Sequence, residues 1–270
     1  MNDILRRSRR AWILLALTAA CASAPESRTS TGSPKGSGVS SKPETTGQSE
    51  YVLSEDVSVR RLAPGVWLHT TLSGEDFGHY PANGLLVEDG EGTLLVDAGW
   101  NPQHAERLVA WAQEELHRPV RAAVATHFHS DRLGGAQALL ARGLPVYGLQ
   151  ETARLAAAQQ RPGPSRTFAE QQRLGPIELF FPGAGHSPDN IVVWHPESAV
   201  LFGGCFIKDA AAKDLGNVGD ADIAAWPASL NRTREHFPQM RIVVPGHGLP
   251  GGSELLTHTQ ELLSATKAPR

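Results

Sequence analysis

The chain has neither the cysteines of a disulfide-stabilised protein nor an excess of basic residues. Only two cysteines occur among 270 residues, Cys21 and Cys205, and they lie in segments of very different composition. A disulfide framework, which needs several closely spaced cysteines, is therefore excluded. Lysines and arginines number 25 against 28 aspartates and glutamates, so the formal net charge is −3. Without a basic surface, the chain is not expected to bind nucleic acid.

The N-terminal apolar run is too short to span a membrane. Residues 11–20 supply about ten apolar positions, whereas a spanning helix needs roughly 20. Arg6, Arg7, Arg9 and Arg10 precede this run and small residues follow it, which is the arrangement of an export signal. Residues 1–24 are therefore predicted to direct export, and the mature protein is expected in the periplasm.

The processing of this signal is open to three interpretations. Residues 17–21, LTAAC, resemble a bacterial lipobox, in which Cys21 is lipidated and attaches the protein to a membrane as a lipoprotein. Residues 22–24, ASA, could instead be an ordinary cleavage site, and residues 8–12 also resemble a twin-arginine signal.

Two further regions follow the signal. Residues 25–50 consist largely of serine, threonine, glycine, proline and lysine. Such a segment cannot bury enough apolar surface to fold, so it is predicted to be a disordered tether. The folded domain is expected to span residues 51–270, which is long enough for a large buried core.

Strand-like and helix-like segments alternate in two similar halves of this domain. Strand patterns lie at residues 57–62, 66–70, 83–88, 92–97, 121–125 and 146–148, and then at 177–181, 191–194, 199–202 and 241–244. Helical patterns lie at residues 104–116, 134–140, 151–160, 223–236 and 254–266. The alternation predicts an α/β protein with two packed sheets and helices outside them.

Six side chains of the kinds that bind zinc lie where predicted strands end. They are His127, His129, Asp131, His186, Cys205 and His247. A lone histidine is usually a core or surface residue, but recurrence at four strand ends favours a metal centre. Cys205 strengthens this interpretation, because a free thiol in an exported protein is prone to oxidation unless it is buried or bound to metal.

From about residue 57 to residue 265, the chain carries motifs that resemble class B metallo-β-lactamases of subclass B1. They are LVDAGW at residues 95–100, HFHSDR at 127–132, PGAGHSPDN at 182–190, GGCFIK at 203–208 and GNVGDAD at 216–222. The motif PGHGLPGG at 245–252 resembles the VIM-like branch, and the context of Lys208 is nearer to the IMP- and NDM-like pattern.

The resemblance implies the four-layer αβ/βα sandwich of that family and two zinc ions per chain. It assigns the first ion to His127, His129 and His186, and the second to Asp131, Cys205 and His247. A hydroxide held between the ions would open the β-lactam ring, oriented by Asp131 and without a protein nucleophile. The implied substrates are penicillins, cephalosporins and carbapenems, their hydrolysis would give antibiotic resistance, and the enzyme is expected to be a monomer.

Four residues outside the ligand set are candidates for contact with substrate. Lys208 could bind the carboxylate of a bicyclic β-lactam, or it could be a solvated surface lysine. Asn217 could donate a hydrogen bond to the lactam carbonyl, or it could be a turn residue. Phe77 and Tyr80 could line a flap over the substrate, or they could belong partly to the core.

Two more residues are candidates for orienting the ligands, Asp97 and Arg132, although Asp97 could instead cap the turn at Gly99. Arg132 stands where glyoxalase-type and RNase-type hydrolases of the same fold have a second histidine. Cys205 likewise replaces their bridging aspartate. The connection from residue 159 to residue 175 is shorter than the subclass B1 pattern, which leaves substrate preference open.

The residues leave two alternative functions open. The chain could be another metallo-hydrolase of this fold that acts on thioesters or lactones. It could also be an exported zinc-binding lipoprotein without catalytic activity.

Overall fold

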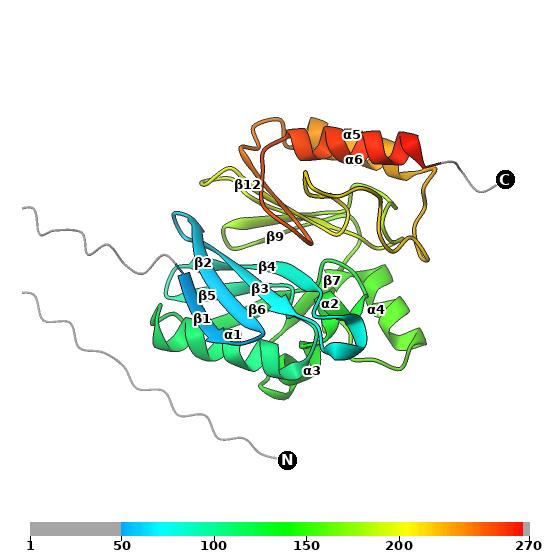
Figure 1. Cartoon of the computed structure of the whole chain (residues 1–270). Helices are drawn as coiled ribbons and strands as arrows, with labels where there is room; N and C mark the ends of the chain where they lie inside the picture. Colours follow the sequence, from blue (N-terminus) through cyan, green and yellow to red (C-terminus); the bar gives the residue numbers. More distant parts are fainter. Residues whose placement is uncertain (1–49, 267–270) are drawn as a thin grey trace, which may run out of the picture. The chain divides into compact units, whose positions relative to one another are not determined.

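In this computed structural model, residues 50–266 are described, and over that range they form two β-sheets and six α-helices (Figure 1). The predicted export signal, the lipobox at Cys21 and nearly all of the predicted tether lie outside the described residues. The first strand begins at Glu50, one residue before the predicted start of the folded domain. Within the described range, no helix is long and apolar enough to cross a membrane.

The first sheet has eight strands in the order β1-β2-β3-β4-β5-β6-β7-β8. They are β1 Glu50–Ser54, β2 Val57–Ala63, β3 Val66–Leu72, β4 Pro81–Asp89, β5 Gly92–Val96, β6 Val120–Val124, β7 Val146–Leu149 and β8 Arg166–Phe168. Neighbours pair antiparallel up to β5 and parallel from β5 to β8. The parallel strands therefore bring their carboxyl ends to one edge of the sheet, as ligand-binding α/β sheets do.

The second sheet has five strands in the order β13-β12-β11-β10-β9. They are β9 Gln171–Leu174, β10 Ile177–Phe180, β11 Val192–His195, β12 Val200–Gly204 and β13 Ile242–Pro245. Only β12 and β13 pair parallel, so the loops that follow them also leave the sheet at a common edge.

The helices are α1 Pro102–Glu114, α2 Ser130–Leu133, α3 Ala136–Ala141, α4 Gln150–Ala158, α5 Trp226–His236 and α6 Glu254–Ala265. A single 3-10 turn, Glu75–Phe77, lies between β3 and β4. Helix α1 begins two residues before the predicted segment 104–116, because the Asn101 side chain accepts a hydrogen bond from the His104 amide at 2.9 Å and Pro102 opens the first turn.

A buried apolar cluster joins the inner faces of the two sheets. It packs Leu68 and Leu85 of the first sheet with Leu179, Val193 and Phe202 of the second. Each fully buried side chain of this size contributes about 1.5–3 kcal/mol relative to exposure, so this layer holds the sheets together.

The outer face of each sheet is covered by helices, as Figure 1 shows for α1 and α3 on one side and α5 and α6 on the other. Leu108 of α1 and Leu139 of α3 are fully buried against the first sheet. Trp226 and Leu230 of α5 and Leu256 of α6 are fully buried against the second. The order of layers is thus helix, sheet, sheet, helix, and the predicted αβ/βα sandwich is confirmed.

Three strands were not predicted. β1 is a partly exposed edge strand in which Val52 is 75% exposed, so it lacks a continuous apolar pattern. β8 and β9 lie inside the stretch 159–175 that the sequence indicated only as a connection, and they are three and four residues long and largely polar.

Two helices differ from the prediction. The helix predicted at 134–140 is α3, which begins two residues later, and the short helix α2 before it was not predicted. Gly134 and Gly135 separate the two helices, and the chain passes so close to its neighbours there that a Cβ on Gly134 would lie 2.0 Å from the Trp100 carbonyl oxygen. The segment predicted from residue 223 begins at Trp226, after Asp222 accepts a hydrogen bond from the Ala225 amide through its side chain.

Candidate metal centre and active site

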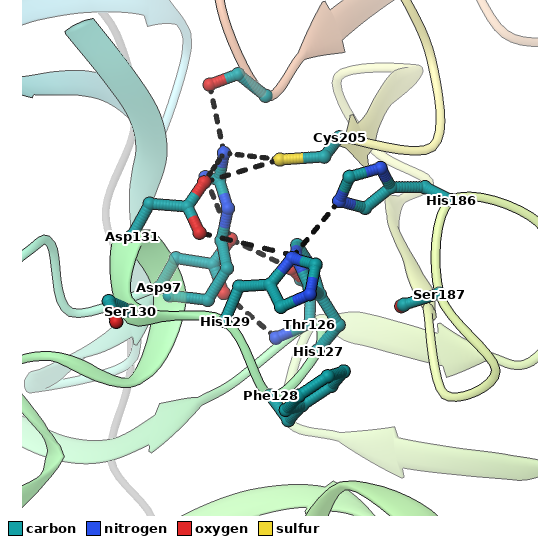
Figure 2. A network of polar contacts seen from close by, with 12 residues as sticks. Asp97, Thr126, His127, Phe128, His129, Ser130, Asp131, His186, Ser187 and Cys205 are labelled. Carbon is teal, nitrogen blue, oxygen red and sulfur yellow. Dashed lines mark hydrogen bonds and ion pairs between the residues drawn. The ribbon is translucent and has the colours of Figure 1, made fainter. Parts of the chain in front are cut away.

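Three histidine side chains from separate segments meet at one point. His127 follows β6, His129 caps α2, and His186 lies in the loop between β10 and β11. The Nδ1 atom of His129 lies 3.1 Å from Nε2 of His127 and 3.2 Å from Nε2 of His186 (Figure 2). Nitrogens bound to one tetrahedral zinc ion, with bonds of about 2.0–2.1 Å, would be about 3.3 Å apart. The observed arrangement therefore fits a single metal ion.

A second group of three side chains has the same compactness. Asp131 lies in the first turn of α2, Cys205 follows β12 and is buried, and His247 follows β13. The Cys205 Sγ atom lies 3.3 Å from Oδ2 of Asp131 and 3.1 Å from Nε2 of His247. His247 Nε2 in turn lies 3.3 Å from the same Asp131 oxygen. Carboxylate, thiolate and imidazole at these separations can hold a second ion.

The two groups adjoin. Potential ligand atoms of His127, His186 and Cys205 also lie within 4.8 Å of one another. The second Asp131 oxygen, Oδ1, lies 4.0 Å from Nε2 of His127. Asp131 therefore extends between the two groups, and ions held by them would be neighbours.

The protonation states of the ligands are set by burial and by neighbouring charge. Burial lowers the pKa of His127 and of His186 well below the usual value, which favours the neutral imidazole that binds metal. Burial alone would raise the pKa of Asp131, but the adjacent Arg132 guanidinium and His247 outweigh it and hold that pKa well below its usual range. For His247, burial opposes the charged form, yet the Cys205 sulfur and Asp131 raise its pKa to about 9.

A buried arginine fixes the second group. Arg132 is fully buried, and its Nη2 atom lies 2.9 Å both from Sγ of Cys205 and from Oδ2 of Asp131. Its Nη1 atom donates to Oδ2 of Asp97 at 3.2 Å. Arg132 thus contacts two candidate ligands directly and orients both.

Asp97 connects Arg132 to the histidine group. Its carboxylate accepts hydrogen bonds from the Thr126 amide at 2.8 Å and from the Thr126 hydroxyl at 2.9 Å, directly before His127. Asp97 has a φ of 59°, which is uncommon for a residue other than glycine and occurs mostly where the surroundings enforce it. Its carboxylate therefore positions the metal-binding loop.

Comparison with known proteins identifies the family. Residues 78–247 match the Metallo-beta-lactamase superfamily. The chain belongs to this superfamily. A curated relative from Bacteroides fragilis, named Metallo-beta-lactamase type 2, is 36% identical over 222 residues, which cover 80% of this chain and 89% of the relative.

Solved structures of metallo-β-lactamases share the fold as well as the sequence. The enzyme from Pontibacter korlensis is 40% identical with a TM-score of 0.74, over 78% of this chain and 100% of that one. A metallo-β-lactamase from Pseudomonas aeruginosa in its mono-zinc form is 34% identical with a TM-score of 0.75, over 79% of this chain and 98% of that one. The resemblance indicated by the sequence motifs is confirmed.

The two metal groups of this metallo-β-lactamase open onto a cavity of about 540 Å³. Tyr80, Lys208 and Asn217 line it together with every candidate ligand except His127, so the structure brings these three predicted residues to the site. The remaining candidate, Phe77, belongs to the 3-10 turn before Tyr80, and its side chain lies outside the described part of the structure.

Lys208 and Asn217 differ in how they are held. The Lys208 Nζ atom lies 5.6 Å from the centroid of the Trp226 ring, and burial lowers its pKa, so it is not the fully solvated lysine of the alternative interpretation. The Asn217 side chain accepts a hydrogen bond from the Gly219 amide at 3.1 Å, as a turn residue does. Asn217 also lines the cavity, so its donation to a lactam carbonyl stays a prediction.

Sequence reasoning missed two contacts that shape this centre. The Asp220 Oδ2 atom lies 2.9 Å from Nε2 of His129, the nitrogen that points away from the other histidines. Such a carboxylate fixes the tautomer of a metal-binding histidine. Tyr80 also packs its ring on His247, with centroids 4.8 Å apart. Asp220 lies within the motif at 216–222, but its contact with His129 becomes evident only from the direction of the His129 imidazole in the structure.

Proposed function

We propose that this metallo-β-lactamase hydrolyses the β-lactam ring of penicillins, cephalosporins and carbapenems with two zinc ions per chain. One observation carries the proposal: two adjacent three-ligand groups open onto the same substrate-sized cavity. The curated and structural relatives, which bear the name metallo-β-lactamase, support the reaction.

The donor atoms favour zinc over harder cations. The first group offers three imidazole nitrogens, and the second includes the sulfur of Cys205. Calcium and magnesium prefer oxygen ligands, whereas imidazole and thiolate are typical of zinc. The structural neighbour in its mono-zinc form supports zinc as the ion.

The residues of the chain divide the chemistry among them. Bound zinc would act as a Lewis acid and make water nucleophilic near neutral pH. Asp131 is suited to orient that water toward the lactam carbonyl carbon, since its low pKa keeps it a hydrogen-bond acceptor. Cys205 is suited to hold metal, because its sulfur lies between Asp131 and His247 and contacts Arg132.

Two residues are suited to hold the substrate while it reacts. Lys208 presents a cation to the carboxylate that bicyclic β-lactams carry, and the Trp226 ring keeps its side chain in place. Asn217 presents an amide NH₂ group to the lactam carbonyl oxygen. A donor aimed at an oxygen that gains negative charge stabilises the transition state.

The place of action is part of the proposal. We propose a monomeric enzyme in the periplasm, where hydrolysis of β-lactams would protect the cell wall enzymes and give resistance. Lipidation of Cys21 would anchor it to a membrane, and about 25 tether residues would give a reach of roughly 25–30 Å. Fractionation of cells that express wild type or Cys21→Ala tests the anchor, and it is refuted if both proteins are wholly soluble.

Hydrolysis of a chromogenic cephalosporin by purified protein tests the reaction itself. We expect ring opening that stops on chelation and returns when zinc is restored. A protein that binds zinc but leaves the cephalosporin intact, while it cleaves a thioester or a lactone, would show a different metallo-hydrolase. Zinc binding without any turnover would favour the non-catalytic alternative.

A further inference from the structure

Arg161 reaches the candidate active site from the short connection that follows α4. Its Nη2 atom donates to the carbonyl oxygen of Phe128 at 2.7 Å, and its Nη1 atom donates to the Ser130 hydroxyl at 3.0 Å. Both acceptors belong to the loop that carries the metal-binding histidines. Arg161 also lines the cavity that contains those ligands.

The backbone around Arg161 fixes the direction of this side chain. Gln160, two residues after the end of α4, has a φ of 55°, and the Arg161 amide donates back to the Ala156 carbonyl at 3.0 Å, which closes the end of the helix. Pro162 and Pro164 then restrict the chain that follows. The guanidinium is therefore presented by a rigid segment.

Within the described part of the chain, the charge of Arg161 has no ion-pair partner. Among residues 50–266, no carboxylate lies within ion-pair distance of its guanidinium, in contrast to Arg132. Burial lowers its pKa, and only a longer-range interaction with Asp131 opposes that effect. Two of its five N–H donors are used in the bonds to Phe128 and Ser130, so three remain for another acceptor.

The cavity thus contains two such cations, each held by a different wall. Lys208 follows Cys205 and stacks over Trp226. Arg161 lies beside Ser130 and follows α4, which packs on the first sheet, whereas Trp226 belongs to α5, which packs on the second. A substrate whose first carboxylate contacts Lys208 would extend its remaining substituents across the metal groups toward the other wall.

We propose that Arg161 binds a second anionic group of the substrate, so that the site prefers β-lactams with an additional carboxylate on the acylamino side chain. The proposal rests on β-lactam hydrolysis as the function. Guanidinium suits this role, because its planar donors match a carboxylate. The competing role is purely structural: Arg161 would only brace the loop between Phe128 and Ser130.

Two penicillins that differ by one carboxylate distinguish these roles. Benzylpenicillin and α-carboxybenzylpenicillin share the ring system and the first carboxylate. In the wild type we expect a lower KM for the dicarboxylate. In Arg161→Gln we expect the KM of the dicarboxylate to rise about three- to tenfold with little change in kcat, and the KM of benzylpenicillin to change less than twofold.

Two further variants complete the experiment. Arg161→Lys keeps the charge and should retain part of the preference for the dicarboxylate. Arg154→Gln removes an equal charge from an exposed position on α4, the helix that precedes Arg161, where Arg154 pairs with Glu151, and should change neither KM. Zinc content and melting temperature of all variants report any damage to the fold.

The outcomes separate the proposal from the function on which it rests. Equal KM changes for both penicillins, or changes in kcat and zinc content alone, would show that Arg161 only braces the loop. Arg161→Lys decides the question if Arg161→Gln fails to fold, because loss of all preference in that folded variant would also overturn the proposal. If the wild type hydrolyses neither penicillin, the proposed function fails and the role of Arg161 fails with it.

Discussion

Replacement of Arg132 by methionine tests how the metal centre is held together before any ion binds. The substitution keeps an extended side chain of moderate volume but removes the cation that lies 2.9 Å from Asp131 and 3.2 Å from Asp97, all of them buried. Breaking one partner of a buried ion pair costs about 3–5 kcal/mol, because the remaining charge is left uncompensated. Since a domain is stable by only about 5–15 kcal/mol, Arg132→Met should lose a large part of its stability.

Urea unfolding of metal-free protein is the appropriate assay. We expect a decrease of about 3–5 kcal/mol in the free energy of unfolding at pH 7. The deficit should shrink when zinc is present, because the ion replaces the guanidinium as the partner of Asp131 and Cys205. The pH dependence provides a second check: the depressed pKa of Asp131 stabilises the wild type above the ordinary carboxyl pKa, and that contribution is lost as the pH falls through the folded-state value. The variant should lose the part of this acid-side contribution that Arg132 supplies, while His247 and His127 still lower the Asp131 pKa. A metal-free variant within 1 kcal/mol of wild type (about the scale of an ordinary surface change) would refute the reasoning.

Three further outcomes are expected. Cys205→Ser should retain the fold but lose the second zinc ion, since a hydroxyl is a poor zinc ligand; two tightly bound ions and a normal rate, measured by metal analysis and kinetics, would contradict this. Lys208→Ala should raise KM for carboxylated β-lactams about ten- to a hundredfold with a smaller change in kcat; an equal effect on an analogue without the carboxylate would indicate a structural role. In metal-free protein the pKa of His247 is about 9, so zinc must displace its proton. The affinity of the second site should therefore weaken about tenfold for each pH unit below that value, with release of about one proton from His247 at pH 7; calorimetry in buffers of different ionisation enthalpy would contradict this if it detects no proton release.

The parts of the site that follow strand ends could be predicted from sequence. His127, Cys205 and His247 each come directly after an apolar strand, and parallel neighbours bring such positions to a common edge. The long apolar strands and helices were predicted for the same reason, because their periodicity reports burial. The signal is local, so it does not depend on how the rest of the chain folds.

The parts that depend on tertiary contact could not be predicted. β8 and β9 are short and polar and form only because β7 and β10 offer them partners. Asp220 is 91 residues from His129 in the chain, and nothing in its own neighbourhood indicates the contact. Arg161 lies in the connection 159–175, for which the sequence indicated only a short length. The direction of its side chain depends on how α4 ends. The export signal, the lipobox and nearly all of the tether lie outside the described residues and stay predictions.

The most direct test of the central claim is a titration of metal-free protein with zinc, followed by both metal analysis and hydrolysis of a chromogenic cephalosporin. The two adjacent ligand groups predict that each chain binds two zinc ions and that β-lactam hydrolysis appears only as these sites fill. Substitution of His127 should abolish the first binding step, and substitution of His247 the second. Full turnover by rigorously metal-free protein, or zinc binding at two sites without any β-lactam hydrolysis, would contradict the account.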